Sequence, residues 1–327
     1  MAAGRCTQSR RLEGATTASG RGPGSVTMPF WRTHFGSEEE NRRVELERRL
    51  RAFYSTVNNY EAYREENWKP EFWAPIRLAI ENSLSHRSCK VLEIGAGRTG
   101  FANYLGGIRS RVEFHVQDVT GRNNEYLRTV ADKVWICDVT QIQESYDVIF
   151  STFVYEHMTA PKAALDYILM MLRPSGSLFI ASPRYDFPGY LSPSARHLSR
   201  VKRLTIVMEL MLRRARVISG GPALFLLHFD PAVFHRPWFR DADAVHWPSI
   251  WDLKRFLHER GGAVMERLRI EPEGLRHAFW ARFLLLFVRI RLLPTPALPS
   301  AQHVSGKAST DQRSDSNWNS GNRECPN

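Results

Sequence analysis

From Lys90 onward, short apolar runs alternate with stretches of helical periodicity, and this alternation limits the possible folds more than any other feature of the chain. The helical stretch at 161–172 is the clearest of those between the runs. The apolar runs fall at residues 90–94, 111–117, 133–137, 146–151 and 176–182. Strands that alternate with helices form βαβ units and pair in parallel. The sequence therefore predicts an α/β fold with a doubly wound, Rossmann-like sheet.

The segments on either side of this core differ from it in composition. Two helical patterns precede it, the first with Ser37 as its predicted N-cap. After the fifth apolar run, a stretch rich in Pro, Arg and aromatic residues interrupts the alternation, which returns as a helix at 249–260, a Gly261-Gly262 stop and a strand at 263–270. We expect six regions: a disordered segment 1–29, a helical cap 30–88, a ligand-binding core 89–183, an insertion 184–248 that covers the acceptor site, a C-terminal part of the core 249–293 and a disordered tail 294–327.

The ends of the chain and its apolar content bear on where the protein acts. The first residues have no apolar stretch of the kind found in secretory signals, and we expect the structured protein to start at Met28. No apolar run approaches the ~20 residues that span a bilayer. The four cysteines form no CxxC pair and have no histidine at zinc-finger spacing, so we predict neither a disulfide framework nor a metal site. These features favour a reducing, cytoplasmic location.

A glycine-rich turn links the first predicted strand to a helix. The run from Val91 to Phe101 reads VLEIGAGRTGF, in which Gly95 permits a tight turn and Gly97 allows close approach of a ligand to the backbone. Backbone N–H groups at the helix start favour an anionic ligand group. The pattern is compatible with an ordinary strand-to-helix turn and with dinucleotide binding, but its place between a strand and a helix favours ligand binding.

Acidic residues follow three of the predicted strands near this turn. Glu93, just before the glycines, suits a ligand with an ammonium group, such as S-adenosylmethionine (SAM), and would repel a pyrophosphate. Asp118 ends the second strand at a distance from the glycines that suits an acceptor of ribose hydroxyl groups. Asp138 ends the third strand, where it can accept a hydrogen bond from an adenine amino group with Val139 against the ring. Each acid alone is also explained as a cap of a neighbouring turn.

The ordered set of motifs resembles class I SAM-dependent methyltransferases, in the group that includes small-molecule, quinone and glycan-modifying enzymes. The motifs are LEIGAGRTGF, HVQD, ICDV, YDVIFSTFVYEHM and LRPSGSLFIASP, and they cover about residues 90–183. The resemblance implies a seven-stranded sheet whose last strand is antiparallel, and SAM as the cofactor. It also implies SAM contacts at seven positions: Glu93, Gly95, Ala96, Gly97, Asp118, Asp138 and Val139.

Two features depart from the family pattern. Thr99 stands where members of the family often have glycine, which puts the shape of the loop in doubt. Residues 281–290 are compatible with either the final strand or a helix, so the C-terminal edge of the sheet is open at this point.

Residues after the fourth and fifth strands are candidates for catalysis and for acceptor binding. His157 is the preferred general base and Glu156 the second choice, although this Glu-His pair is equally compatible with a role in ordering its loop. Tyr185 and Tyr190, in a Pro- and Gly-containing turn, are predicted to contact the acceptor or else to pack as a small satellite core.

The formal net charge of +11 favours anionic partners. Basic and apolar residues alternate at helical spacing in 195–216, and a similar mixture occurs from Trp280 to Arg291. Each is compatible with peripheral contact with an acidic membrane, although core packing with a solvated basic side is the favoured explanation. Without an aromatic-rich RNA-binding module or a base-flipping signature, nucleic acid is not expected as a partner.

The favoured function is therefore SAM-dependent methyl transfer to a small-molecule, lipid-linked or glycan acceptor. One alternative is an NAD(P)-dependent oxidoreductase that uses the same glycine loop, against which Glu93, Asp138 and the LRPSG turn argue. Another is a catalytically silent, methyltransferase-like binding protein. The sequence does not identify the acceptor or the atom that is methylated.

Overall fold

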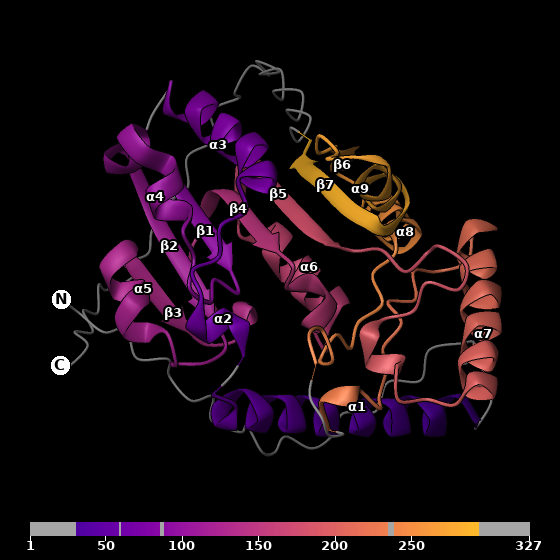
Figure 1. Ribbon diagram of the computed structural model, residues 1–327. Coiled ribbons are helices and arrows are strands. Elements are labelled where there is room, and N and C mark those ends of the chain that lie inside the picture. Colours follow the sequence, from indigo (N-terminus) through magenta and orange to yellow (C-terminus); the bar gives the residue numbers. More distant parts are fainter. Residues whose placement is uncertain (1–30, 59, 86–87, 235–238, 294–327) are drawn as a thin grey trace, which may run out of the picture. The chain divides into compact units, whose positions relative to one another are not determined.

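The computed structural model describes residues 31–58, 60–85, 88–234 and 239–293 (Figure 1). The segments 1–29 and 294–327, for which we predict disorder, and the predicted start at Met28 lie outside the described residues. All described residues belong to a single structural unit, Met1–Pro294.

Seven strands form a single sheet in the order β3-β2-β1-β4-β5-β7-β6. The strands are β1 (Cys89–Ile94), β2 (Val112–Asp118), β3 (Lys133–Ile136), β4 (Tyr146–Thr152), β5 (Leu172–Pro183), β6 (Ala263–Arg267) and β7 (Leu285–Leu292). The pairs β1–β2, β1–β4, β2–β3 and β4–β5 are parallel, whereas β7 runs antiparallel to both β5 and β6. The predicted α/β fold and its antiparallel last strand are confirmed.

Helices cover both faces of this sheet because its central strands are apolar on both sides. The helices are α1 (Trp31–Thr56), α2 (Glu61–Arg64), α3 (Pro70–Leu84), α4 (Phe101–Leu105), α5 (Asn124–Val130), α6 (Pro161–Met170), α7 (Arg200–Ile218), α8 (Ile250–Arg260) and α9 (Leu275–Phe279). Buried side chains of α3, α4 and α5 pack on one face, in a cluster that includes Val91 and Phe150. Those of α6 and α8 pack on the other face, in a cluster with Leu92 and Ile149.

The N-terminal helix α1 packs against the segment between β5 and α8, residues 184–249, which we call the β5–α8 segment. Leu46, Leu50 and Tyr54 of α1 share a buried cluster with Ala232 and Val245. Parts of the chain about 190 residues apart in sequence therefore form one wall next to the carboxyl ends of the strands. Contacts of this range are not encoded in local sequence patterns.

Several boundaries differ from those predicted. Helix α1 begins at Trp31, so Ser37 lies inside the helix and is not its N-cap. Helix α7 begins at Arg200 rather than 195, because the Ser199 hydroxyl accepts from the Lys202 N–H and caps it. The Gly261 stop is confirmed, since this residue ends α8 at a φ of +69°.

The structure decides between the strand and the helix that the sequence left open for the C-terminal edge of the sheet. Residues 285–292 are strand β7, so the alternative of a single interfacial helix from Trp280 to Arg291 is wrong. Alternating side chains of β7 pack on the two faces of the sheet, which is why its apolar run is nearly continuous.

The predicted turn at Leu172–Gly176 is partly wrong as well. Pairing of β5 already begins at Leu172, and a register shift with Ser175 at a φ of +67° replaces a free turn.

Candidate active site

A cavity of about 530 Å³ lies where β1, β2 and β3 end. We call its lining from the strand ends and the turns after them the floor: Ile94, Gly95, Gly97, Gln117, Asp118, Asp138 and Val139. We call its lining from α1, α2 and the β5–α8 segment the roof: Arg43, Glu47, Leu50, Arg51, Tyr54, Tyr60, Glu61, Ala62, Tyr63, Arg240 and Asp241. Lys69, the turn after β4 and the start of α6 also line the cavity, as do Asn67, Val119, Thr140 and Gln141. A volume of this size is typical of small-molecule sites.

The glycine turn of the floor is held in place by side chains of the next strand. The N–H of Gly95 donates to Gln117 Oε1 at 3.1 Å, and that of Gly97 donates to Asp118 Oδ2 at 3.1 Å. Both glycines have positive φ, which other residues rarely adopt. A Cβ atom at Gly97 would lie 3.0 Å from the carbonyl oxygen of Ala62, so α2 also requires a glycine here. The turn is thus shaped by protein contacts as well as by any ligand.

The acids predicted at the ends of β2 and β3 both line the cavity. Asp118 is buried, and its Oδ1 accepts from the Thr120 N–H at 2.9 Å. Burial raises the pKa of Asp118, and its backbone hydrogen bonds act in the opposite direction. Asp138 is more open, accepts from the Thr140 N–H at 3.0 Å, and lies 3.8 Å from Arg51 of the roof. Each carboxylate retains lone pairs for further donors.

Glu93 and Ala96 do not line the cavity, although the resemblance implies contacts for both. Ala96 is buried in the core beside the sheet. Glu93 is buried, and its Oε2 atom has no hydrogen-bond partner among the described residues. Burial raises the pKa of Glu93 to about 8, while Thr99 and the Lys69 ammonium group act in the opposite direction. Glu93 therefore lies behind the glycine turn, with Lys69 as the cation nearest to its charge.

His157 lines the cavity and lies beside two residues from distant parts of the chain. Its Nδ1 is 3.4 Å from Oδ2 of Asp243, a fully buried carboxylate that also accepts from the Tyr54 hydroxyl at 2.6 Å. Burial alone would lower the pKa of His157, but the carboxylates of Asp243 and Glu156 outweigh this and raise it. The contact is at ion-pair distance without a hydrogen bond, because Nδ1 has no hydrogen-bond partner among the described residues. An imidazole beside a carboxylate can take up a proton.

Three of the predicted substrate or catalytic residues lie away from the cavity. Glu156 is buried, and its Oε2 accepts from the Ser182 hydroxyl at 2.9 Å, so it holds β5 to the turn after β4 and does not support a role as a base. Tyr185 and Tyr190 stack on each other at 5.2 Å and pack in a cluster with Trp247. The predicted contact of these tyrosines with the acceptor is not supported, because the turn that carries them folds inward.

Most of the roof and one half-buried cation were not predicted from the sequence. Lys69 lines the cavity and donates to the Thr152 carbonyl oxygen at 3.3 Å. Burial lowers the pKa of Lys69, and Glu93 and Glu156 oppose this shift. No motif marks Lys69, Tyr54 or Asp243, since their place depends on packing between distant segments. Gln117 could have been predicted from the sequence, because it is a polar residue directly before Asp118 at the carboxyl end of a mostly buried strand.

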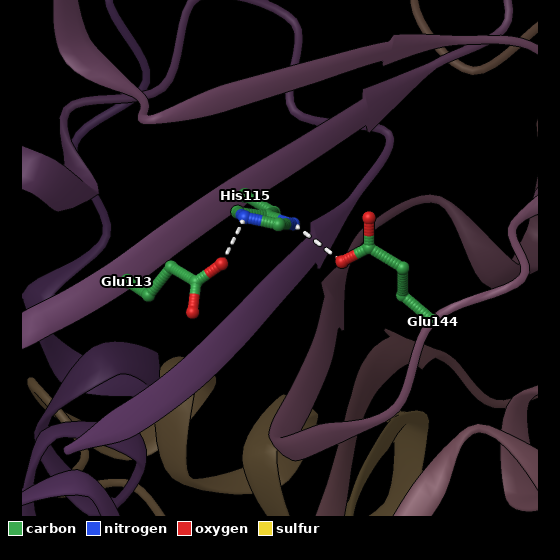
Figure 2. Close-up of side chains that lie close together, drawn as sticks. All are labelled: Glu113, His115 and Glu144. Carbon is green, nitrogen blue, oxygen red and sulfur yellow. Dashed lines mark ion pairs between the residues drawn. The ribbon is translucent and has the colours of Figure 1, made fainter. Parts of the chain in front are cut away.

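A second group of titratable side chains lies outside the cavity lining (Figure 2). His115 lies between two carboxylates, with Nε2 2.9 Å from Glu113 and Nδ1 3.6 Å from Glu144. Three donor atoms within 4.8 Å of one another could hold a metal ion. However, Lys90 pairs with both acids, and Lys133 pairs with Glu144. Two ammonium groups already balance the charge, so we interpret the group as an ion-pair network.

Comparison with known proteins places this geometry in a family. A family model described as a methyltransferase domain matches residues 41–266, which is more than half of the chain. The chain belongs to this methyltransferase family. It is a SAM-dependent methyltransferase, as the resemblance of its motifs implies, and the alternative of an NAD(P)-dependent oxidoreductase is wrong. A search of curated proteins finds no match.

Solved structures similar to this methyltransferase share little sequence with it. The plantazolicin methyltransferase BpumL, in complex with a pentazolic desmethylPZN analog and SAH, is 12% identical with a TM-score of 0.46, over 79% of this chain and 98% of that one. The N-methyltransferase NodS from Bradyrhizobium japonicum WM9 is 17% identical with a TM-score of 0.37, over 68% and 97%. The 1,6-didemethyltoxoflavin-N1-methyltransferase of Burkholderia thailandensis is 14% identical with a TM-score of 0.40, over 83% and 94%.

Proposed function

We propose that this methyltransferase transfers the methyl group of SAM to a small-molecule, lipid-linked or glycan acceptor that carries a hydroxyl group, with SAM on the floor and the acceptor under the roof. One observation carries this proposal: the floor and the roof, which differ in the chemistry of their side chains, line the same cavity. The floor offers carboxylates and a glycine turn. The roof offers three tyrosines and arginines, and His157, in the turn after β4, lines the same cavity next to the buried Asp243.

The floor fits the polar groups of SAM. Asp118 suits the ribose hydroxyl groups, and Asp138 with Val139 suits the adenine, as predicted from the sequence. Lys69 is the half-buried cation that suits the carboxylate of the methionine part. The unpartnered Oε2 of Glu93, just behind this turn, is compatible with a contribution to the binding of the ammonium group. The proposed cofactor-binding set is therefore Lys69, Gly95, Gly97, Asp118, Asp138 and Val139.

The roof fits an acceptor with an aromatic or otherwise apolar body. Tyr54, Tyr60 and Tyr63 line it together with Leu50 of α1. Tyrosine side chains offer large apolar faces and a hydroxyl group each, which suits a planar acceptor with polar substituents. Arg43 and Arg51 reach the same lining but are paired with Glu47, so the roof is not a purely cationic site.

SAM supplies an activated methyl group when it is bound, and the protein contributes alignment and removal of the acceptor proton. His157 is the general base in this proposal. The Asp243 carboxylate lies beside the Nδ1 edge of the imidazole and favours its protonated form, so that Nε2 accepts the hydroxyl proton as the acceptor oxygen attacks. The Tyr54 hydroxyl fixes the Asp243 carboxylate in turn. Asp243 and Tyr54 are positioning residues, since they act through His157.

Transfer of labelled methyl groups from SAM to a panel of phenols, sugars and lipid-linked hydroxyl compounds tests this function. We expect turnover with at least one hydroxyl acceptor, and a loss of kcat of about 10²- to 10⁴-fold in His157→Asn. The affinity for SAM, measured by calorimetry, should stay unchanged in this variant. His258→Asn, an exposed histidine on α8, is the matched control and should behave like the wild type.

Each part of the proposal has its own contradicting outcome. Full activity of His157→Asn would remove this residue from the mechanism. Thermal stabilisation by SAM without turnover on any acceptor would favour a silent binding protein. The absence of stabilisation by SAM would contradict the placement of the cofactor on the floor.

A further inference from the structure

Helix α7, which lies in the β5–α8 segment, has an inner face that fixes it to the rest of the molecule (Figure 1). Leu210 and Val217 are buried on this face. Between them Arg214 is also buried, pairs with Asp252 of α8 and donates to the Trp247 carbonyl oxygen at 2.8 Å. The orientation of the helix about its axis is therefore determined by specific contacts.

The outer face of the same helix is apolar and exposed. Val201, Leu204, Met208 and Leu212 recur at intervals of three and four residues, which places them on one stripe along about three turns. These four side chains are between 57% and 76% exposed, and Ile218, farther along the helix, is 56% exposed. Single exposed apolar residues are common on protein surfaces, but a continuous stripe of this length marks a surface that binds something.

Basic residues accompany this stripe. Lys202, Arg213 and Arg216 lie along one side of it, and Arg200 and Arg203 lie at its start. The helix contains a single acid, Glu209, which pairs with Arg213. Among the described residues, no carboxylate forms an ion pair with Lys202, Arg203 or Arg216. The outer face of α7 is therefore apolar with a positive border.

Exposed aromatic rings extend this surface beyond the helix. Phe187, Phe279 and Phe283 are each more than one-third exposed and contact one another, with ring centroids 5.1 to 6.2 Å apart. Phe187 lines the same small hollow as Met211 of α7, so the rings adjoin the stripe. Arginines gather here too. Burial lowers the pKa of Arg267, and the neighbouring positive charges of Arg184 and Arg282 lower it further.

We propose that the outer face of α7 and the adjoining phenylalanines bind the surface of an acidic membrane. Apolar side chains would enter the boundary between headgroups and acyl chains, while the basic border meets anionic headgroups, as in other interfacial helices. Among the described residues, no helix combines the length and the apolar character that a membrane span needs. A second copy of the chain fits this surface less well, because pairing two such faces would bring their basic borders together.

Co-sedimentation of the full chain with vesicles tests this proposal. We expect binding to vesicles of phosphatidylcholine with 30% phosphatidylserine, weaker binding at high salt, and little binding to phosphatidylcholine alone. The variant L204S/M208S/L212S should bind at least about tenfold more weakly, since it loses three inserted apolar groups. The variant K202E/R213E/R216E should lose the preference for acidic vesicles. These side chains are exposed, so the fold should persist, as circular dichroism can check.

The control V44S/L78S/M170S removes three exposed apolar side chains from α1, α3 and α6 and should bind like the wild type. Equal binding of this control and the α7 triple-serine variant would overturn the proposal, as would equal binding of the wild type to acidic and neutral vesicles. A dimer in light scattering that the α7 triple-serine variant dissociates, without vesicle binding, would assign the surface to a second copy instead. None of these outcomes depends on methyl transfer.

Discussion

The two halves of the cavity differ in how their side chains are held. In the floor, Asp118 and Gln117 are fixed by neighbours in the same sheet, through hydrogen bonds to the glycine turn. In the roof, Tyr54 is joined by one hydrogen bond of 2.6 Å to Asp243, which lies outside the cavity lining and nearly 190 residues away in sequence. The floor is thus a property of the fold, whereas the roof depends on how additions to the fold pack together. In the proposed function, the floor binds SAM and the roof selects the acceptor.

Asp118→Ala gives the largest effect expected for the floor. The carboxylate supports the Gly97 N–H and, in the proposed function, the ribose hydroxyl groups of SAM. Loss of charged hydrogen bonds of this kind should weaken SAM binding about 100-fold, measured by calorimetry. Asp132→Ala, which removes an acid beyond the other end of β2, should leave SAM affinity unchanged. Retained SAM affinity in Asp118→Ala would break the assignment of the floor to the cofactor.

The residues predicted from the sequence lie mostly in the floor, whereas the residues that were missed lie mostly in or next to the roof. Asp118, Asp138, Gly95 and Gly97 could be found because strand ends in a parallel sheet meet at one edge, so local patterns suffice. His157 was found by its place after β4, but its partner Asp243 was not.

The positions of the two candidate acceptor tyrosines outside the cavity have the same physical explanation. Tyr185 and Tyr190 follow the carboxyl end of β5 and were expected in the site. Instead, packing against Trp247 draws them into a satellite core. Where burial depends on partners far away in the sequence, periodicity contains no information about it.

Asp243→Asn tests how a carboxylate next to the roof controls the protonation of His157. The carboxylate raises the pKa of His157, and the base must be neutral to accept a proton. Activity of the wild type should therefore rise with pH through the raised pKa. The variant should shift the midpoint of this rise to lower pH, because the favourable charge is lost while an amide oxygen remains for Tyr54. Asp166→Asn on α6 is the control for the pH profile of kcat, and an unshifted midpoint in Asp243→Asn would refute the positioning role.

Glu93→Gln tests the buried acid behind the floor through stability. The pKa of Glu93 is raised to about 8 by burial, whereas the unfolded chain titrates near 4.5. Between these values the folded protein holds a proton that the unfolded chain has released. The unfolding free energy should therefore fall as pH rises across this window, by at most about 1.4 kcal/mol per pH unit from this group. Denaturant unfolding at pH 5.5, 6.5 and 7.5 should show a shallower decline in Glu93→Gln, and identical slopes would contradict the raised pKa.

Tyr63→Phe gives the smallest expected effect and tests whether the floor and the roof are linked. Tyr63 belongs to the roof, yet its hydroxyl is hydrogen-bonded to Thr120, which in turn donates to Asp118 of the floor. If the two halves are linked here, losing the hydroxyl should raise both the Kd of SAM and the KM of the acceptor by roughly two- to fivefold, in line with one neutral hydrogen bond. Tyr167→Phe, which removes a hydroxyl bonded to the Ile142 carbonyl oxygen, is the matched control. A change in the acceptor KM alone would mean that floor and roof act independently, because Thr120 would then hold Asp118 without help from Tyr63.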